Sequence, residues 1–304
     1  MLSTKLGKIT LKNPLILGSG ILGVTGASLV NVAKNGAAGV TTKSISMNPR
    51  EGHPNPTVLV YSEGLINAVG LSNEGVEKSI EEIKYARDHS DAVIIASIVG
   101  FSIEEFGRIA KEISKANPHM IELNLSCPNV EDEHGKPYAT DAKLAAAAVH
   151  EVKKNTKLPI IAKLSPNVNN IAEIAQAVEK AGADAICAIN TVGPGMVINI
   201  NAAKPVLANK AGGVSGPAIK PIAVRCVYDI YKAVNIPIIG IGGITTGEDA
   251  VEMMMAGASA VGIGSAVYYR GIEVFDKINS EIQEFMKKHG YKSISEIIGK
   301  AHEN

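Results

Sequence analysis

The chain has 304 residues, of which 46% are hydrophobic and 20% are charged, so it can bury a large core and wholesale disorder is excluded. Its 30 basic and 30 acidic side chains balance, which argues against a partner that is a nucleic acid. Because it has no run of about 18 apolar residues and no signal-peptide pattern at its N-terminus, we expect a cytoplasmic protein with no membrane contact.

Short runs rich in β-branched residues recur along the chain, and stretches with helical periodicity lie between them. The runs are residues 14–19, 39–45, 92–99, 120–127, 159–165, 185–191, 237–243 and 260–265. The clearest helical stretches are residues 76–89, 103–116, 141–155, 171–181, 218–234 and 247–256. Eight β-then-α units in about 250 residues predict an α/β fold of the closed (β/α)8 (TIM) barrel type, which the count favours over an open doubly wound sheet.

Three segments lie outside this repeat. Residues 1–12 alternate like a short β-hairpin with Gly7-Lys8 at its turn, and we expect them to close the bottom of the barrel. Residues 46–74 and 193–216 are long and rich in Gly and Asn, and they follow the second and sixth strands. We expect them at the carboxyl face of the barrel, where barrel enzymes hold their active sites. No linker divides residues 1–304, so we expect one domain.

Glycines follow the last two predicted strands, at Gly242-Gly243 and at Gly264, which precedes Ser265. Glycine lets backbone N–H groups come close to an anion, and the start of the next helix adds a favourable dipole. Either motif alone is equally typical of a tight strand-to-helix turn. Two of them in adjacent final units favour a phosphate site, which barrels usually hold at this position.

Lys163 lies in an otherwise apolar strand, and Lys43 ends another. A buried ammonium group needs an anion or a carbonyl partner, because burying an isolated charge is costly. Lys163 can be a Schiff-base lysine, a cation that stabilises an anionic cofactor, or a lysine that reaches solvent from the end of its strand.

Cys127 lies in Asn-Leu-Ser-Cys-Pro-Asn, residues 124–129, where Pro128 ends the strand. A cysteine in such a loop can act as a general base or a nucleophile, or it can be idle. We interpret Cys187 and Cys226 as ordinary buried residues. The three cysteines form no CxxC pair and no histidines stand at metal-ligand spacing, so we expect neither a disulfide framework nor a metal site.

Several motifs together resemble the class 1 dihydroorotate dehydrogenases, over nearly the whole chain. They are residues 124–129, Lys43-Ser44, Ile-Asn-Ala-Val-Gly-Leu at 66–71, Ala-Gly-Gly-Val-Ser-Gly at 211–216 and Gly-Tyr-Lys-Ser-Ile at 290–294. The resemblance implies an FMN-dependent barrel that oxidises dihydroorotate to orotate in pyrimidine synthesis. It implies that Cys127 removes the C5 proton of the substrate while hydride passes from C6 to the flavin.

The resemblance also implies two sets of binding residues. The substrate residues are Lys43, Asn67, Val69, Gly70, Leu71, Asn124, Asn129, Asn190 and Thr191. The FMN residues are Ser19, Lys43, Ser44, Asn124, Lys163, Ile189, Gly216, Gly242, Gly243, Gly264 and Ser265. In this scheme Lys163 favours the charge of the reduced ring, and the last five residues hold the phosphate.

The forms of residues 66–71 and 290–294 resemble type 1B of the family. That type implies an NAD-linked heterotetramer: a homodimer core plus a partner subunit that carries FAD and a 2Fe-2S iron–sulfur cluster. The chain departs from the family pattern at Ile21, His53, Thr57 and Asn199, which bears on the partner and the loops more than on the chemistry.

Four alternatives stay open at this point. One is a fumarate-linked type 1A homodimer. Another is a pyrimidine reductase similar to dihydropyrimidine dehydrogenase, although Asn129 in place of histidine favours dihydroorotate. The others are a non-redox barrel that uses Lys163 as a Schiff base, and a flavin-binding subunit without activity of its own.

Overall fold

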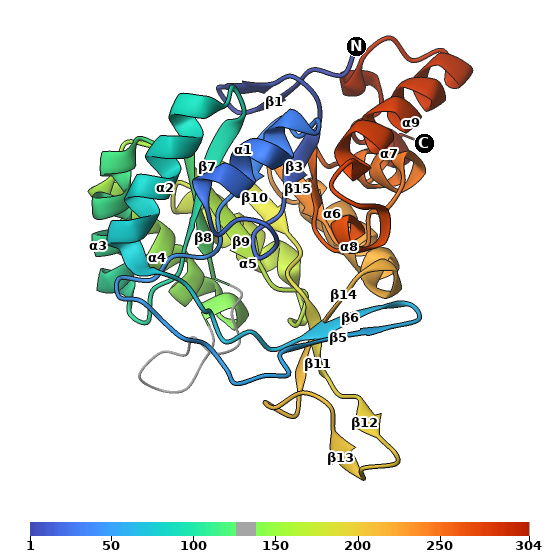
Figure 1. The fold of residues 1–304 in the computed structure, drawn as a ribbon. Coiled ribbons are helices and arrows are strands. Elements are labelled where there is room, and N and C mark those ends of the chain that lie inside the picture. Colours follow the sequence, from blue (N-terminus) through green and yellow to red (C-terminus); the bar gives the residue numbers. More distant parts are fainter. Residues whose placement is uncertain (126–137, 304) are drawn as a thin grey trace.

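The computed structural model describes residues 1–125 and 138–303. Eight parallel strands close into a barrel in the order β3-β4-β7-β8-β9-β10-β15-β16, which confirms the predicted (β/α)8 architecture (Figure 1). The strands are shorter than the apolar runs that predicted them. Their bounds are β3 Leu15–Leu17, β4 Gly39–Thr41, β7 Val93–Ile98, β8 Met120–Asn124, β9 Ile160–Leu164, β10 Ala185–Ala188, β15 Ile238–Ile241 and β16 Ala260–Ile263.

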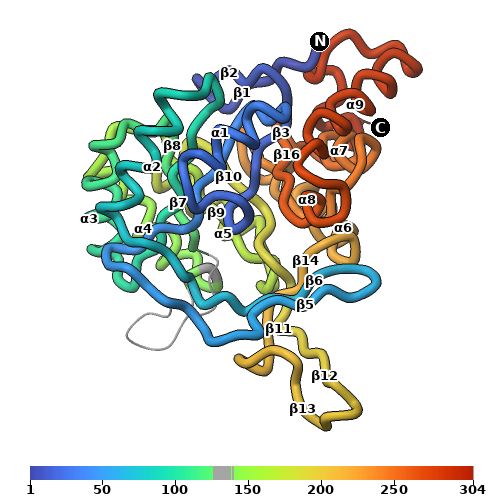
Figure 2. Tube along the Cα trace, viewed as in Figure 1, coloured from blue at the N-terminus to red at the C-terminus, as the bar shows by residue number. Residues whose placement is uncertain are grey.

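Helices surround the barrel on its outside (Figure 2). Their bounds are α1 Gly26–Lys34, α2 Gly75–His89, α3 Ile103–Ile113, α4 Ala142–Asn155, α5 Ile171–Lys180, α6 Lys220–Tyr231, α7 Gly247–Met255, α8 Ala266–Arg270 and α9 Val274–His289. Several begin at a side chain that accepts a backbone N–H: Ser102 caps α3, Asp141 caps α4 and Asn170 caps α5. Within the described ranges, no helix is long and apolar enough to cross a membrane.

The N-terminal hairpin closes the amino-terminal end of the barrel, as predicted. Strands β1 (Thr4–Leu6) and β2 (Ile9–Leu11) pair with Leu6 opposite Ile9, which leaves Gly7-Lys8 at the turn. Leu6 and Leu11 pack in one apolar cluster with interior strand residues such as Met120 and Ile161. Apolar side chains therefore fill the lower part of the barrel among the described residues, and the largest part of its polar wall lies nearer the carboxyl end.

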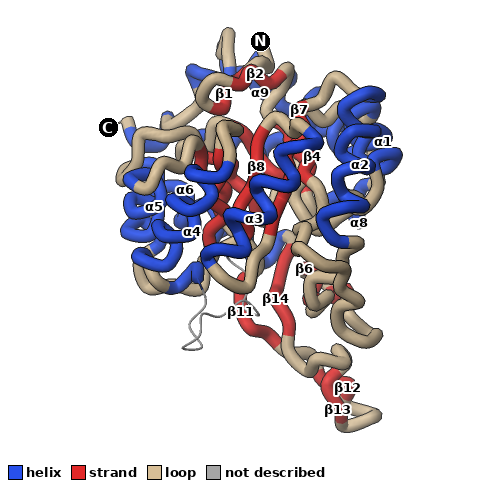
Figure 3. Tube along the Cα trace, turned by 90° about the vertical axis from the view of Figure 1, so that its left-hand side faces the viewer, coloured by secondary structure: helices blue, strands red, loops and turns tan. Residues whose placement is uncertain are grey.

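The two long segments leave the carboxyl end and pair with each other, which the sequence patterns did not predict. Strands β5 (Val58–Tyr61) and β6 (Gly64–Asn67) join β11 (Val192–Gly195) and β14 (Gly212–Ser215) in a four-stranded antiparallel sheet of order β11-β14-β6-β5. A second hairpin, β12 (Ile198–Asn199) with β13 (Lys204–Pro205), extends beyond it. Figure 3 shows both at the end of the molecule opposite β1 and β2.

Candidate active site

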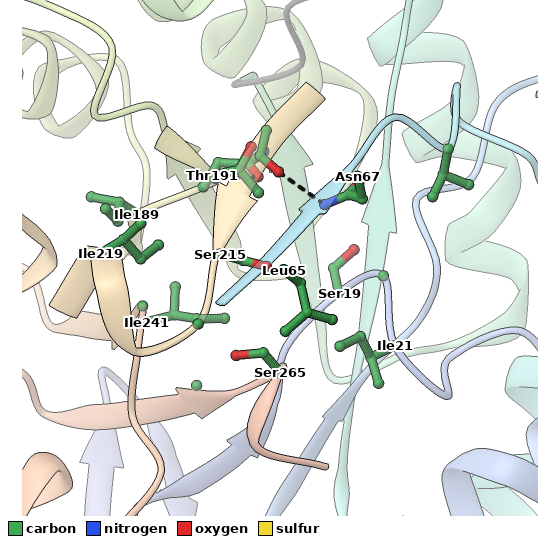
Figure 4. Close-up of a pocket in the computed structure, with 18 of the residues that line it drawn as sticks. Ser19, Ile21, Leu65, Asn67, Ile189, Thr191, Ser215, Ile219, Ile241 and Ser265 are labelled. Carbon is green, nitrogen blue, oxygen red and sulfur yellow. Dashed lines mark hydrogen bonds between the residues drawn. The ribbon is translucent and has the colours of Figure 1, made fainter. Parts of the chain in front are cut away.

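A cavity of about 340 Å³ lies at the carboxyl end of the barrel, and strands β6 and β14 of the added sheet contribute to its wall (Figure 4). Asn67 at the end of β6 donates a hydrogen bond from Nδ2 to the carbonyl oxygen of Gly213 in β14, at 3.5 Å. This contact ties the two long segments together at the cavity. The volume falls within the range of about 300–1,000 Å³ that is usual for small-molecule sites.

All of the predicted binding residues that the structure describes line this one cavity. They are Ser19, Lys43, Ser44, Asn67, Val69, Gly70, Leu71, Asn124, Lys163, Ile189, Asn190, Thr191, Gly216, Gly242, Gly243, Gly264 and Ser265. Cys127 and Asn129 lie outside the described residues. The binding roles of all these residues, and the catalytic role of Cys127, stay predictions.

Part of the cavity wall comes from residues that the sequence patterns did not indicate. These residues are Gly20, Ile21, Val58, Leu65, Ala68, Gly213, Ser215, Ile219, Ile241, Ile244 and Gly262. Some signal was present, since Ala68 and Ser215 lie inside motifs that carried the family resemblance. Val58 and Leu65 could not be found in this way, because they reach the cavity through the unpredicted pairing of β5, β6 and β14.

Glycine backbone forms part of one side of the cavity. A Cβ added at Gly264 meets no atom closer than Ile21 Cδ1 at 4.0 Å, so that position opens into the cavity. Gly243 has φ +73°, and a Cβ there lies 2.6 Å from the Cβ of Lys220, so glycine is required by both conformation and space. This side therefore presents backbone groups that an anionic ligand can approach closely.

A charged network holds the turn that follows Gly243. The carboxylate of Asp249, in the first turn of α7, accepts hydrogen bonds from the backbone N–H groups of Thr245 and Thr246. Lys220 Nζ lies 2.7 Å from Asp249 Oδ1. Partial burial alone raises the pKa of Asp249, but Lys220 and the Thr245 and Thr246 hydrogen bonds outweigh it and lower that pKa to about 2. Asp249 is therefore a carboxylate at neutral pH and stabilises the turn.

The opposite side of the cavity contains buried charge. Lys163 in β9 lines the cavity, and its Nζ lies 4.0 Å from Oε1 of Glu122 in β8. The two side chains are only 6% and 3% exposed. Burial lowers the pKa of Lys163, but the Glu122 carboxylate raises it, so the net direction is upward. Lys163 is therefore a buried ammonium ion, which excludes the prediction that it reaches solvent.

Buried hydroxyls connect the same carboxylate to the cavity wall. Ser97 in β7 donates to Glu122 Oε1 at 2.9 Å, and its oxygen lies 3.2 Å from Ser44 Oγ. Ser44 in turn accepts from Asn124 Nδ2 at 2.9 Å and lies 3.3 Å from Ser19 Oγ. Cys187 is the other close neighbour: burial and the nearby Glu122 raise the pKa of its thiol, which therefore stays protonated.

Comparison with known proteins identifies relatives over nearly the full length. The family model described as dihydroorotate dehydrogenase matches residues 1–286. The catalytic subunit of dihydroorotate dehydrogenase B (NAD(+)) from Methanocaldococcus jannaschii is 50% identical over 306 residues, covering 100% of this chain and 99% of the relative. Subunits of the same name from Methanosarcina mazei and Pyrococcus abyssi are each 48% identical, covering 97% and 99% of this chain and 93% and 99% of the relatives.

Proposed function

The chain belongs to the dihydroorotate dehydrogenase family, and from this we propose that it is the catalytic subunit of an NAD(+)-linked enzyme that oxidises dihydroorotate to orotate in pyrimidine synthesis. One observation carries the proposal: a buried lysine, asparagine amides and glycine turns line one cavity, although they come from parts of the chain between Ser19 and Ser265. The shared name of the relatives supports the NAD-linked form over a fumarate-linked one.

FMN is the cofactor that we propose for this cavity. Three features support the fit: a volume of about 340 Å³, the opening at Gly264, and the Lys163 ammonium. Gly264 and Ser265, with the other predicted phosphate residues, would hold the phosphate through backbone groups, and Lys163 would face the part of the ligand that gains negative charge. When bound, FMN supplies the redox chemistry by accepting two electrons from the substrate.

The chain itself must orient the substrate and move a proton. We assign the substrate ring and carboxylate to the amide-rich part of the cavity, at Asn67, Asn124 and Asn190. Cys127, which lies outside the described residues, is the proposed base that takes the C5 proton of dihydroorotate. A cysteine suits this role because part of its thiol is ionised to the thiolate near neutral pH. A serine hydroxyl group is not ionised at that pH.

The test is the anaerobic reduction of the FMN-loaded protein by dihydroorotate, with the rate measured from the loss of flavin absorbance. Cys127→Ala should keep FMN and lose about 10²–10⁴-fold in the rate, since that is the usual contribution of a positioned general base. Cys127→Ser should be slow at neutral pH and recover as pH rises. Wild-type protein that binds no flavin would contradict the whole proposal, whereas an unchanged rate in Cys127→Ala would remove only the role of Cys127.

The electron acceptor needs a separate experiment, because the catalytic subunit is one component of the proposed enzyme. Purification of the native complex should recover a second subunit with FAD and a 2Fe-2S cluster, and the complex should reduce NAD+. Recovery of a homodimer that reduces fumarate and not NAD+ would favour the type 1A alternative. The heterotetramer, the single-domain organisation and the cytoplasmic location stay predictions.

A further inference from the structure

Glu122 occupies an unusual position for a carboxylate. It lies inside the barrel wall on β8, 3% exposed, and it is not among the residues that line the cavity. An uncompensated buried carboxylate is very costly, so its partners must account for it. Those partners come from two neighbouring strands: Ser97 on β7 and Lys163 on β9.

The hydroxyl chain that ends at Glu122 has a fixed direction. A carboxylate only accepts hydrogen bonds, so the single proton of the Ser97 hydroxyl points to Glu122. Ser44 must then donate to Ser97, and Ser19 must donate to Ser44. The Ser44 oxygen is left as an acceptor, which agrees with the donation from Asn124 Nδ2.

This direction has a consequence at the cavity. Ser19 lines the cavity and has committed its only hydroxyl proton inward, so toward a ligand it can only accept hydrogen bonds. Asn124 also lines the cavity, and one of its amide protons is committed to Ser44, which fixes the orientation of the amide. Without an acceptor such as a carboxylate at the far end, each hydroxyl in the chain could reverse.

The same carboxylate controls a charge at the cavity. Its Oε1 lies 4.0 Å from Lys163 Nζ, beyond a hydrogen bond but close enough for a strong interaction in a buried site. The positive charge of the ammonium group is therefore only partly neutralised by Glu122. A ligand that becomes more negative gains from the remaining attraction.

We propose that Glu122 is a positioning residue that acts through Lys163 and through the Ser97–Ser44 chain to set the charge and the hydrogen-bond direction at the cavity. The inference rests on the proposed binding of FMN. It predicts that Glu122 determines how much more tightly the protein binds reduced FMN than oxidised FMN. A residue with a purely structural role would weaken both forms equally and leave their affinity ratio unchanged.

The experiment measures this ratio from the reduction potential of FMN bound to the protein relative to free FMN, at pH 8, by titration with redox dyes. Glu122→Gln keeps the shape and an acceptor for Ser97 but leaves the Lys163 charge unopposed. We expect the ratio to rise by about tenfold or more, because loss of the carboxylate adds one net positive charge beside the ligand and charges interact strongly in a buried site. A ratio within twofold of wild type would overturn the inference.

Three further variants separate the effect of Glu122 on the Lys163 charge from its effect on the Ser97–Ser44 hydroxyl chain. Glu122→Asp keeps the charge and should stay near the wild-type ratio. Ser97→Ala breaks the hydroxyl chain and keeps the charge, so it should weaken both forms of FMN by a similar factor. The double variant Glu122→Gln with Lys163→Gln removes the pair without leaving an unpaired charge, which protects folding. Its ratio should fall below wild type, and a ratio equal to wild type would also overturn the inference.

Failure of the inference can be distinguished from failure of the proposed function. If the wild-type protein binds no FMN, both are wrong. If it binds FMN and Glu122→Gln changes neither the ratio nor the rate of reduction by dihydroorotate, only the role of Glu122 is wrong.

Discussion

The two sides of the cavity are built by different means. On the side of β15 and β16, glycine backbone at Gly243 and Gly264 forms part of the wall, beside the side chains of Ile241 and Ser265. On the side of β7 to β10, the wall rests on buried polar side chains centred on Glu122 and Lys163. The first side depends on the absence of side-chain atoms, and the second depends on a balance of charge. A substitution should therefore harm the first side through volume and the second through an unpaired ion.

The largest effect is expected on the charged side. Lys163→Met removes the cation and leaves Glu122 buried without a counter-charge, which typically costs about 3–5 kcal/mol in the free energy of unfolding. Urea denaturation of the purified protein measures this loss. If the protein lost less than about 1 kcal/mol, the pair would behave like an exposed one and the contrast between the two sides would fail.

An exposed ion pair in the same barrel supplies the control. Lys153 Nζ lies 2.8 Å from Asp184 Oδ2, with side chains 42% and 40% exposed. Because solvent screens such a pair, Lys153→Met should cost at most about 1 kcal/mol. The exposed pair has the shorter distance, 2.8 Å against 4.0 Å for the buried pair. If Lys163→Met nevertheless costs more free energy of unfolding, the difference must come from burial and not from separation.

The next effect is expected on the glycine side, and it should appear in binding and not in folding. Gly264→Val places its side chain in the open space of the cavity, where the nearest protein atom to its Cβ is Ile21 Cδ1 at 4.0 Å. We expect FMN affinity to fall about 10- to 100-fold, since overpacking costs about 1–3 kcal/mol. Fluorescence titration with FMN measures the affinity, and thermal unfolding without FMN should be nearly unchanged.

Gly290 gives a control for a glycine substitution away from the cavity. It has φ +78° and no atom within 4 Å of an added Cβ, and it ends α9. Gly290→Ala should therefore lower stability by about 1 kcal/mol through backbone strain and leave FMN binding intact. If Gly264→Val kept full affinity for FMN, the phosphate would have to bind elsewhere.

The two sides also differ in how well the sequence predicted them. Gly243, Gly264 and Lys163 were found because each stands out at or near the end of an apolar strand, and strand ends of a parallel barrel meet at one face. Glu122 stands out in the same way, two residues before Asn124 and on the same face of β8, but it was not assigned a role. Its role depends on Ser97, which the strand register places opposite it, and on Lys163, which the register places opposite Asn124.

The four-stranded antiparallel sheet of order β11-β14-β6-β5 could not be predicted for a related reason. Gly213 pairs with Asn67, and the two residues are separated by most of the barrel in the sequence. Both segments are rich in glycine and asparagine, so they lack the strong apolar alternation that predicts strands. Local patterns give the periodicity of a strand, but the choice of its partner is a property of the folded barrel.

The smallest effect concerns Asp249, the carboxylate that stabilises the turn on the glycine side. Its pKa is about 2 in the folded protein against an ordinary value of 3.8, so the folded state favours the carboxylate. The stability that it contributes is complete above about pH 4 and is lost as pH falls toward 2. Asp249→Asn should cost about 1 kcal/mol at neutral pH, because the variant loses the ion pair with Lys220 and weakens the capping box that Asp249 forms with Thr246 at the start of α7.

The pH profile of the free energy of unfolding distinguishes this role from a general loss of charge. Between pH 4 and pH 2 the wild-type protein should lose more stability than Asp249→Asn, because the variant has no carboxylate to protonate at that position. Asp229 gives the control, since its carboxylate pairs with the exposed Arg225 on α6 away from the glycine turn. Asp229→Asn should keep the steeper wild-type profile. If both variants gave the same profile, Asp249 would be an ordinary surface carboxylate, and the glycine side would depend on shape alone.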